Sequence, residues 1–367
     1  MRTSLAIVYN EPHYSRYNTL GEEKAAYGVL EAVDAVHQAL SETGYNVVLV
    51  PLMPPLKQVK RKLLSINAAL VFNLFEGFCG CPETEAAVPE ILSELGLPYT
   101  GCPGSLLRLA LDKAKVKVIL KTAGIPTPNF TLLNPQTLHM LQLNYPCIVK
   151  PRCEDASHGL TIESVVSNFA SLAKQVTAIS ESYGGAALVE EFIDGREFNA
   201  TILGNSEYIV LPVSEIVYSL LPGMPRVLTF AAKWETDSPY FQGTRAVCPA
   251  NIGDTERQHI METAVTAFRL LGGKGYARID MRMDELGQVN VIEVNPNPDI
   301  SPGSGAIRQA EVAGMTYAHF IDRIVQMALG QKGNENQNPL YDSSGQTEYN
   351  NNTTPYARVQ SLRSGSC

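Results

Sequence analysis

Short apolar segments alternate with amphipathic segments over the first hundred residues, and this alternation constrains the fold more than any other feature. Residues 5–9, 46–50 and 68–75 are typical of strands. Residues 22–40 and 83–95 have the three-to-four spacing of apolar positions that is typical of helices. A strand–helix–strand order predicts a parallel sheet with helices on its faces.

The chain that follows predicts further mixed structure. Asp194-Gly195 is typical of a hairpin turn, and apolar strand segments precede and follow it. The predicted strands here are 147–150, 160–165, 187–192 and 197–203. The predicted helices are 112–123, 167–180, 256–271 and 305–329.

Composition excludes several classes of protein. The chain has 367 residues, enough for two or three domains. A net charge of -8 argues against general affinity for nucleic acid or an anionic membrane. No apolar run reaches the ~18 residues of a membrane helix, and residues 5–9 are too short for a signal peptide. Seven scattered cysteines favour a reducing, cytoplasmic setting.

The segment from Gly275 to Pro298 carries the strongest chemical pattern. Two strand-like runs flank the turn signal Asp284-Glu285-Leu286-Gly287, which predicts a β-hairpin. A simple register would set Asp280 near position 291 and bring four polar residues to one face: Arg278, Asp280, Glu293 and Asn295. Two carboxylates and an amide oxygen suit Mg²⁺, and the arginine suits an anion bound to it. An exposed, chemically inert hairpin face is the alternative.

Two other segments give weaker evidence of function when each is taken by itself. Lys150 ends an apolar strand and precedes a loop with Ser157 and Gly159 that could fold over phosphates. Taken alone, this loop is more typical of a surface hairpin with a solvent-facing His158. The run from Glu190 to Glu197 could bind a base and a sugar, although a charged hairpin tip is the more common meaning of such a run. The sequence contains no P-loop motif, so a nucleotide site would be of another kind.

Together these segments resemble the ATP-grasp superfamily and, within it, the D-alanine–D-alanine ligase family. The resemblance covers residues 1 to about 330. It is carried by the order and spacing of Leu111-Asp112-Lys113, Val149-Lys150-Pro151, Val189-Glu190-Glu191-Phe192, Gly195-Arg196-Glu197-Phe198, Lys233, Gly275-Tyr276-Ala277-Arg278-Ile279-Asp280 and Glu293-Val294-Asn295.

The resemblance implies an α/β and α+β chain, an ATP-grasp fold with an N-terminal Rossmann-like parallel-sheet domain. We expect the N-terminal domain over 1–108, a central lid domain over 109–190 and a C-terminal ATP-grasp domain over 191–330. The tail over 331–367 has few apolar residues, so we expect it to be disordered.

The resemblance also implies the roles of individual residues. Lys113, Lys150 and Lys233 would contact the phosphates of ATP, Glu190, Glu191 and Ile193 its adenine side, and Glu197 its ribose. Asp280, Glu293 and Asn295 would hold two Mg²⁺ or Mn²⁺ ions. Arg278 would steady the transferring phosphoryl group, and Ser157 would lie in the loop that closes over it.

Three departures from the family pattern concern the amino-acid sites. Glu23 is a loose match to the glutamate that holds the first amino group. The segment before Lys233 lacks the tyrosines of the family. Asp299 stands where the family has a glycine, and Ser304 remains where the carboxylate of the second substrate would bind.

The resemblance therefore implies an ATP-dependent carboxylate–amine ligase, with D-alanyl-D-alanine synthesis for peptidoglycan as the first expectation. The alternatives are a ligase for another amino acid or metabolite, and a catalytically silent nucleotide-binding module. Small carboxylate or amino-acid substrates are the expected partners, and the family suggests a homodimer.

Overall fold

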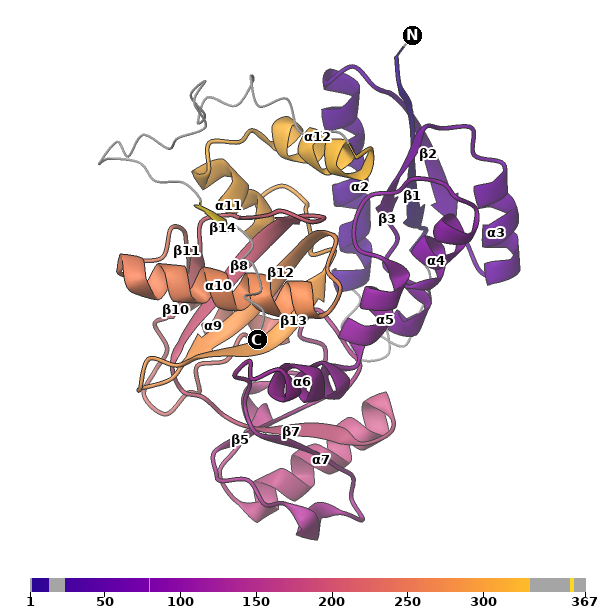
Figure 1. Cartoon of the computed structure of the whole chain (residues 1–367). Coiled ribbons are helices and arrows are strands. Elements are labelled where there is room, and N and C mark those ends of the chain that lie inside the picture. Colours follow the sequence, from indigo (N-terminus) through magenta and orange to yellow (C-terminus); the bar gives the residue numbers. More distant parts are fainter. Residues whose placement is uncertain (1, 13–23, 79, 331–356, 360–367) are drawn as a thin grey trace, which may run out of the picture.

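The computed structural model describes residues 2–12, 24–78, 80–330 and 357–359. The strands of these residues form three sheets (Figure 1). In Figure 1 a four-stranded sheet lies at the bottom, a larger sheet lies above it, and a parallel N-terminal sheet lies to the right. No helix in this described part of the chain is long and apolar enough to cross a membrane.

The N-terminal sheet has the parallel order β2-β1-β3, which confirms the expected alternation. Its strands are β1 (Ser4–Asn10), β2 (Asn46–Leu52) and β3 (Leu70–Leu74). The helices of this region are α2 (Lys24–Glu42), α3 (Leu56–Leu64) and α4 (Ala87–Glu94). Side chains alternate along β1, so Ile7 packs toward α2 and Val8 packs toward α3 and α4.

The helix expected over 83–95 begins later than predicted. A 3₁₀ turn, Pro82–Thr84, precedes α4. The Thr84 hydroxyl accepts from the Phe78 amide at 2.7 Å and donates to the Cys81 carbonyl at 2.7 Å. These side-chain bonds to the backbone compete with the first turn of a helix.

The four-stranded sheet is antiparallel, in the order β4-β7-β5-β6, and α7 (Phe169–Tyr183) packs on it. Its strands are β4 (Phe130–Leu133), β5 (Cys147–Lys150), β6 (Val165–Val166) and β7 (Ala187–Glu191). The strand expected over 160–165 is mostly a 3₁₀ turn, Ile162–Ser164, because Thr161 and Ser164 form a capping box there.

The large sheet has the order β11-β10-β8-β12-β13, with β9 on β8 and β14 on β9. Its strands are β8 (Arg196–Gly204), β9 (Tyr208–Val210), β10 (Ser214–Tyr218), β11 (Thr244–Val247), β12 (Gly275–Met283), β13 (Val289–Pro296) and β14 (Ala357–Val359). Strand β14 differs from the expectation of a disordered tail. The rest of the tail lies outside the described residues.

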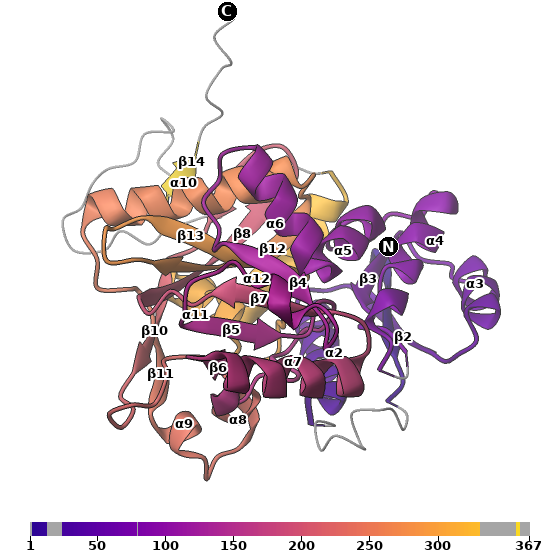
Figure 2. The ribbon, with the colours of Figure 1, turned by 90° about the horizontal axis from the view of Figure 1, so that it is seen from below.

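Helices cover both faces of the large sheet. Residues of α5 (Gly104–Leu111), α6 (Lys113–Thr122) and α10 (Asp254–Leu270) share one apolar core with β8, β12 and β13. Helices α11 (Gly305–Val312) and α12 (Tyr317–Ala328) join the core of the N-terminal sheet. Seen from below, α8 (Phe230–Trp234) and α9 (Pro239–Gln242) lie beyond the ends of β10 and β11 (Figure 2).

Two predicted elements are corrected. The segments around Asp194-Gly195 do not pair with each other: β7 pairs with β4 and β5, whereas β8 pairs with β10 and β12. Gly195 is needed because a Cβ there would lie 1.7 Å from the Met283 carbonyl oxygen. The helix expected over 305–329 is divided into α11 and α12 near Gly314, which has a φ of 80°.

Candidate active site

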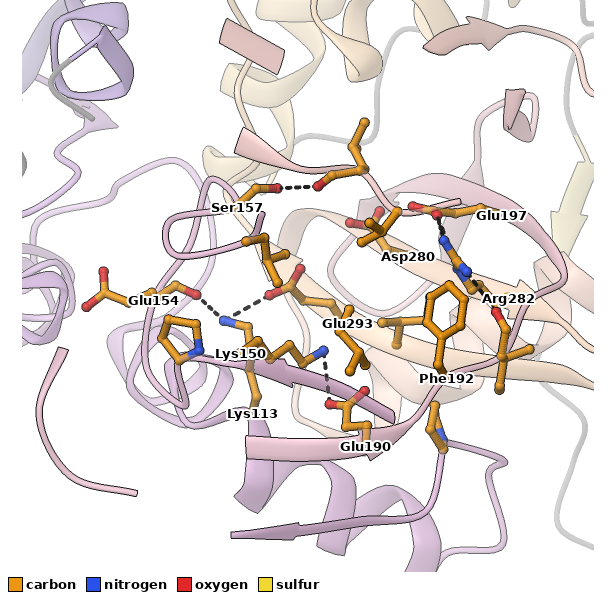
Figure 3. Close-up of a pocket in the computed structure, with 18 of the residues that line it drawn as sticks. Lys113, Lys150, Glu154, Ser157, Glu190, Phe192, Glu197, Asp280, Arg282 and Glu293 are labelled. Atoms are coloured by element: carbon orange, nitrogen blue, oxygen red, sulfur yellow. Dashed lines mark hydrogen bonds and ion pairs between the residues drawn. The ribbon is translucent and has the colours of Figure 1, made fainter. Parts of the chain in front are cut away.

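A cleft between the four-stranded sheet and the large sheet gathers most of the residues that the motifs indicate (Figure 3). It holds about 850 Å³ of empty space, open solvent at its mouth included. The predicted residues that line it are Lys113, Lys150, Ser157, Glu190, Glu191, Ile193, Glu197, Lys233, Asp280 and Glu293. Arg278 and Asn295 hydrogen-bond to Asp280.

Lys113 begins helix α6 and is held in place by contacts around the N-terminus of that helix. Asp112 caps the helix and pairs with the Arg152 guanidinium at 2.8 and 2.5 Å. The Lys113 ammonium lies 2.9 Å from Glu293 Oε1 and also donates to the Glu154 carbonyl. Lys113 is 7% exposed, so its positive charge is held inside the cleft.

Glu190 is 1% exposed and is neutralised by two lysines. Its Oε1 lies 2.9 Å from Lys150 Nζ and 3.2 Å from Lys117 Nζ. Burial would raise the pKa of Glu190, but these ammonium groups hold it below its usual value. Burial lowers the pKa of Lys117 to about 8, and its ammonium also donates to Thr127 Oγ1 at 2.9 Å. Sequence reasoning missed Lys117, although a lysine among the apolar positions of a predicted helix was an available signal.

Lys117→Met is expected to destabilise the fold by about 2 kcal/mol, because it removes one partner of a buried carboxylate. The loss of stability would be larger if Glu190 lost both lysine partners, but Lys150 remains beside it. Urea unfolding measures the loss. Lys121→Met is the matched control, because Lys121 is one turn further along α6 and exposed. Equal losses in the two variants would contradict the prediction.

The hairpin β12–β13 brings its four polar residues to one face, but not in the simple register. Arg278 is opposite Asn295, and Asp280 is opposite Glu293 rather than near Val291. An irregularity directly after Asp280 shifts the register. Arg278 donates to both oxygens of Asp280 at 2.7 and 2.8 Å, and Asn295 Nδ2 donates to Asp280 Oδ2 at 2.9 Å. The hairpin thus presents a fixed carboxylate pair to the cleft.

The charges around this pair suit a divalent cation that arrives with an anionic ligand. Burial opposes ionisation of Glu293, but Lys113 and Lys150 lower its pKa to about 2, so it stays ionised at neutral pH. Burial outweighs Arg278 and raises the pKa of Asp280. Within the described residues no three His, Cys, Asp or Glu side chains group together as a metal site. The oxygens of Asp280, Glu293 and Asn295 fit Mg²⁺, which usually takes one or two carboxylates together with phosphate oxygens.

Two loops meet over the cleft. The Ser157 hydroxyl donates to the Leu228 carbonyl at 3.0 Å. His158 was expected to face solvent, but it is 5% exposed and its ring lies 5.6 Å from the Phe230 ring. This contact with the first residue of α8 covers the imidazole. Lys233, at the end of α8, also lines the cleft, and its surroundings lower its pKa mainly by desolvation.

At the other end of the cleft, Glu197 accepts three hydrogen bonds on its Oε2 atom. They come from the Tyr218 hydroxyl at 2.7 Å and from Arg282 at 2.5 and 3.1 Å. Glu191 turns its carboxylate toward Asn129, at 2.8 Å. Sequence reasoning missed Arg282; its signal was an arginine two residues after Asp280, on the same face of the strand.

The residues predicted for the amino-acid sites do not line this cleft. Asp299 is exposed, and its carboxylate accepts from the Ser301 amide at 2.8 Å and hydroxyl at 2.6 Å. The Ser304 hydroxyl is buried at the start of α11, without a hydrogen-bond partner among the described residues. Glu23 lies outside the described residues.

Glu76 is a further acidic residue that sequence reasoning missed. It follows β3, at the carboxyl edge of the parallel sheet, where open α/β sheets bind ligands. Desolvation by the surrounding protein raises its pKa, and the charges of Asp299 and Asp155 add to the effect. The neutral form of the Glu76 carboxyl is therefore favoured on this side of the site.

Comparisons with known proteins agree with this geometry. Residues 119–326 match the family model described as D-ala D-ala ligase C-terminus. A D-alanine–D-alanine ligase of Sphingopyxis alaskensis is 31% identical over 299 residues, covering 80% of this chain and 91% of that protein. An uncharacterised protein of Sinorhizobium fredii, y4sG, is 35% identical over 308 residues, covering 80% and 86%.

The fold is similar to that of solved ligases. The Bacillus anthracis D-alanine–D-alanine ligase complexed with ATP has a TM-score of 0.68 at 19% identity, covering 89% of this chain and 98% of that one. The Enterococcus faecalis VanG D-Ala:D-Ser ligase also has a TM-score of 0.68, at 20% identity, covering 89% and 100%. These likenesses confirm the expected ATP-grasp fold. Because the family model matches more than half of the chain, the chain belongs to the D-alanine–D-alanine ligase family.

Proposed function

We propose that this ligase uses ATP to convert an amino-acid carboxylate into an acyl phosphate, which the amine of a second substrate then attacks. The products are an amide, ADP and phosphate. The carboxylate needs activation because its oxygen is a poor leaving group. The observation that carries the proposal is the cleft in which Lys113, Lys150 and Lys233 face the carboxylates of the β12–β13 hairpin.

Phosphoryl transfer depends mainly on positioning and charge neutralisation. We assign Lys113, Lys150 and Lys233 to the phosphates. Arg278 would steady the transferring phosphoryl group and the oxyanion that forms when the amine attacks. The loop with Ser157, already in contact with the loop before α8, would keep water from the acyl phosphate.

We assign the binding of the nucleoside part of ATP to the residues near the connection between the two sheets. Glu190 and the backbone of Glu191 and Ile193 would bind adenine, and Glu197 would bind the ribose. Their positions along one cleft support this assignment.

Asp280, Glu293 and Asn295 would hold two Mg²⁺ or Mn²⁺ ions. When bound, such ions neutralise the charge of the phosphates. Glu293 already pairs with Lys113 and Asp280 with Arg278, so the two carboxylates are held beside the cations that we assign to the phosphates. We also propose a cytoplasmic location, because the reaction would consume ATP.

D-Alanine is the first candidate for both substrates, because relatives carry that activity in their names. A second candidate is an acceptor that carries an additional positive charge. Asp299 supports it, because this exposed carboxylate stands where the family has a glycine and would pair with a cationic group of the acceptor.

Phosphate release with ATP and Mg²⁺, across single and paired D- and L-amino acids, tests the proposal, with mass spectrometry of the products. We expect release with D-alanine and formation of its dipeptide. Release only with a basic amino acid or a diamine would support the second candidate. Binding of ATP without release, with every member of a wider panel of carboxylates and amines, would contradict the proposed ligase activity.

A further inference from the structure

The guanidinium of Arg282 connects three separate parts of the ATP cleft. It lies on β12, is 4% exposed, and donates to Glu197 of β8 (Figure 3). It also donates to the Ile193 carbonyl at 2.7 Å and to the Arg226 carbonyl. Ile193 belongs to the connection between the two sheets. Arg226 belongs to the loop that precedes α8, the helix that carries Lys233. The Arg282 side chain thus links Glu197, the proposed ribose ligand, to the connection between the two sheets and to the loop before α8.

The contacts with Glu197 set the orientation of its carboxylate. Arg282 and Tyr218 both donate to Oε2, which leaves Oε1 directed to accept from a ligand. The Phe192 ring lies 5.0 Å from the Arg282 guanidinium and holds it from one side. Because a charged, buried acceptor with two fixed donors has little rotational freedom, its free oxygen is preorganised.

We infer that Arg282 is a positioning residue that sets Glu197 for the ribose hydroxyls and thereby makes the ligase select ribonucleotides. The inference rests on the proposed function, since it takes Glu197 as the ribose ligand. Arg282 itself acts through Glu197 and the two carbonyls. Its loss would therefore affect the part of nucleotide binding that depends on the sugar hydroxyls more than the part that depends on adenine or phosphate.

Calorimetric binding of ATP and of 2′,3′-dideoxy-ATP, without amino acids, tests the inference independently of the acceptor. Hydrogen bonds to a charged group predict that the wild-type protein binds ATP about tenfold or more tightly than the dideoxy analogue. In Arg282→Met this preference is expected to fall to about threefold or less. An unchanged preference, with both nucleotides weakened equally, would overturn the inference and indicate a merely structural role.

Arg196→Met is the matched control. Arg196 also pairs bidentately with a glutamate of the large sheet, Glu215, at 2.7 Å, and also lies 5.0 Å from an aromatic ring, that of Phe198. It does not line the cleft, so the preference for ATP should be retained. If Arg282→Met does not fold, Arg282→Lys keeps the charge but cannot reach all three partners. The preference of Arg282→Lys for ATP over the dideoxy analogue should also fall, and an unchanged preference would overturn the inference.

The same titrations separate this inference from the proposed function. A wild-type protein that binds neither nucleotide would contradict the ATP-dependent activity itself. A wild-type protein that binds both equally would contradict the role of Glu197 and, with it, that of Arg282. Binding that discriminates in the wild type and in Arg282→Met alike would leave the proposed function intact and remove only the inference.

Discussion

Glu293→Gln is expected to lower turnover by about a thousandfold or more, which corresponds to several kcal/mol of transition-state stabilisation. Glu293 is ionised at neutral pH because Lys113 and Lys150 lower its pKa to about 2, and glutamine cannot supply that charge to a metal. Initial rates of ADP formation with saturating ATP and Mg²⁺ measure the effect. A rate within tenfold of the wild type would show that the metal assignment is wrong.

The same variant tests how Glu293 contributes to stability. A carboxylate whose pKa is lowered on folding stabilises the protein above its unfolded pKa of about 4.5, and that contribution is lost as the pH falls toward 2. Glu293→Gln should therefore have a somewhat lower melting temperature at pH 7 but still unfold cooperatively. Glu285→Gln is the matched control, since Glu285 is exposed in the turn of the same hairpin and should keep both turnover and stability.

Arg278→Lys is expected to lower kcat by about a hundredfold, with a smaller change in the KM for ATP. Lysine keeps the positive charge, but it cannot make the two parallel hydrogen bonds that Arg278 makes to Asp280 at 2.7 and 2.8 Å. Asp280, which we propose as a metal ligand, and the oxyanion that we propose to form would each lose a fixed partner. Steady-state rates with varied ATP separate the two parameters.

Arg245→Lys is the control for this substitution. Arg245 is exposed on β11 of the same sheet, so its replacement should leave both parameters unchanged. If Arg278→Lys raised the KM for ATP a hundredfold and left kcat unaltered, Arg278 would act in nucleotide binding and not in the transfer step.

The polar face of the β12–β13 hairpin could be predicted because alternation along a strand is local. The turn at 284–287 and the spacing of Arg278 and Asp280 were enough to bring the four groups to one face. The register could not be predicted, because the irregularity after Asp280 depends on how β12 fits between β8 and β13. The pairing of Asp280 with Glu293 followed only from that fit.

The hairpin predicted at Asp194-Gly195 failed for a related reason. Both strands exist, but a turn dipeptide does not specify which strands will pair when each has better partners elsewhere. The connection between β7 and β8 thereby became the link between two sheets, with the cleft beside it. Lys117 and His158 were missed or misplaced because their burial results from contacts with distant segments.

The sequence by itself determined the strand–helix alternation of the N-terminal sheet, the family and the polar face of the β12–β13 hairpin, because periodicity, turn residues and motif spacing are properties of neighbouring residues. Only the tertiary structure decided which charges face each other. Lys113 meets Glu293, Lys117 meets Glu190, and Arg282 meets Glu197 across long stretches of chain. These pairs form where sheets and helices pack together, and burial in that packing makes their charges interact strongly.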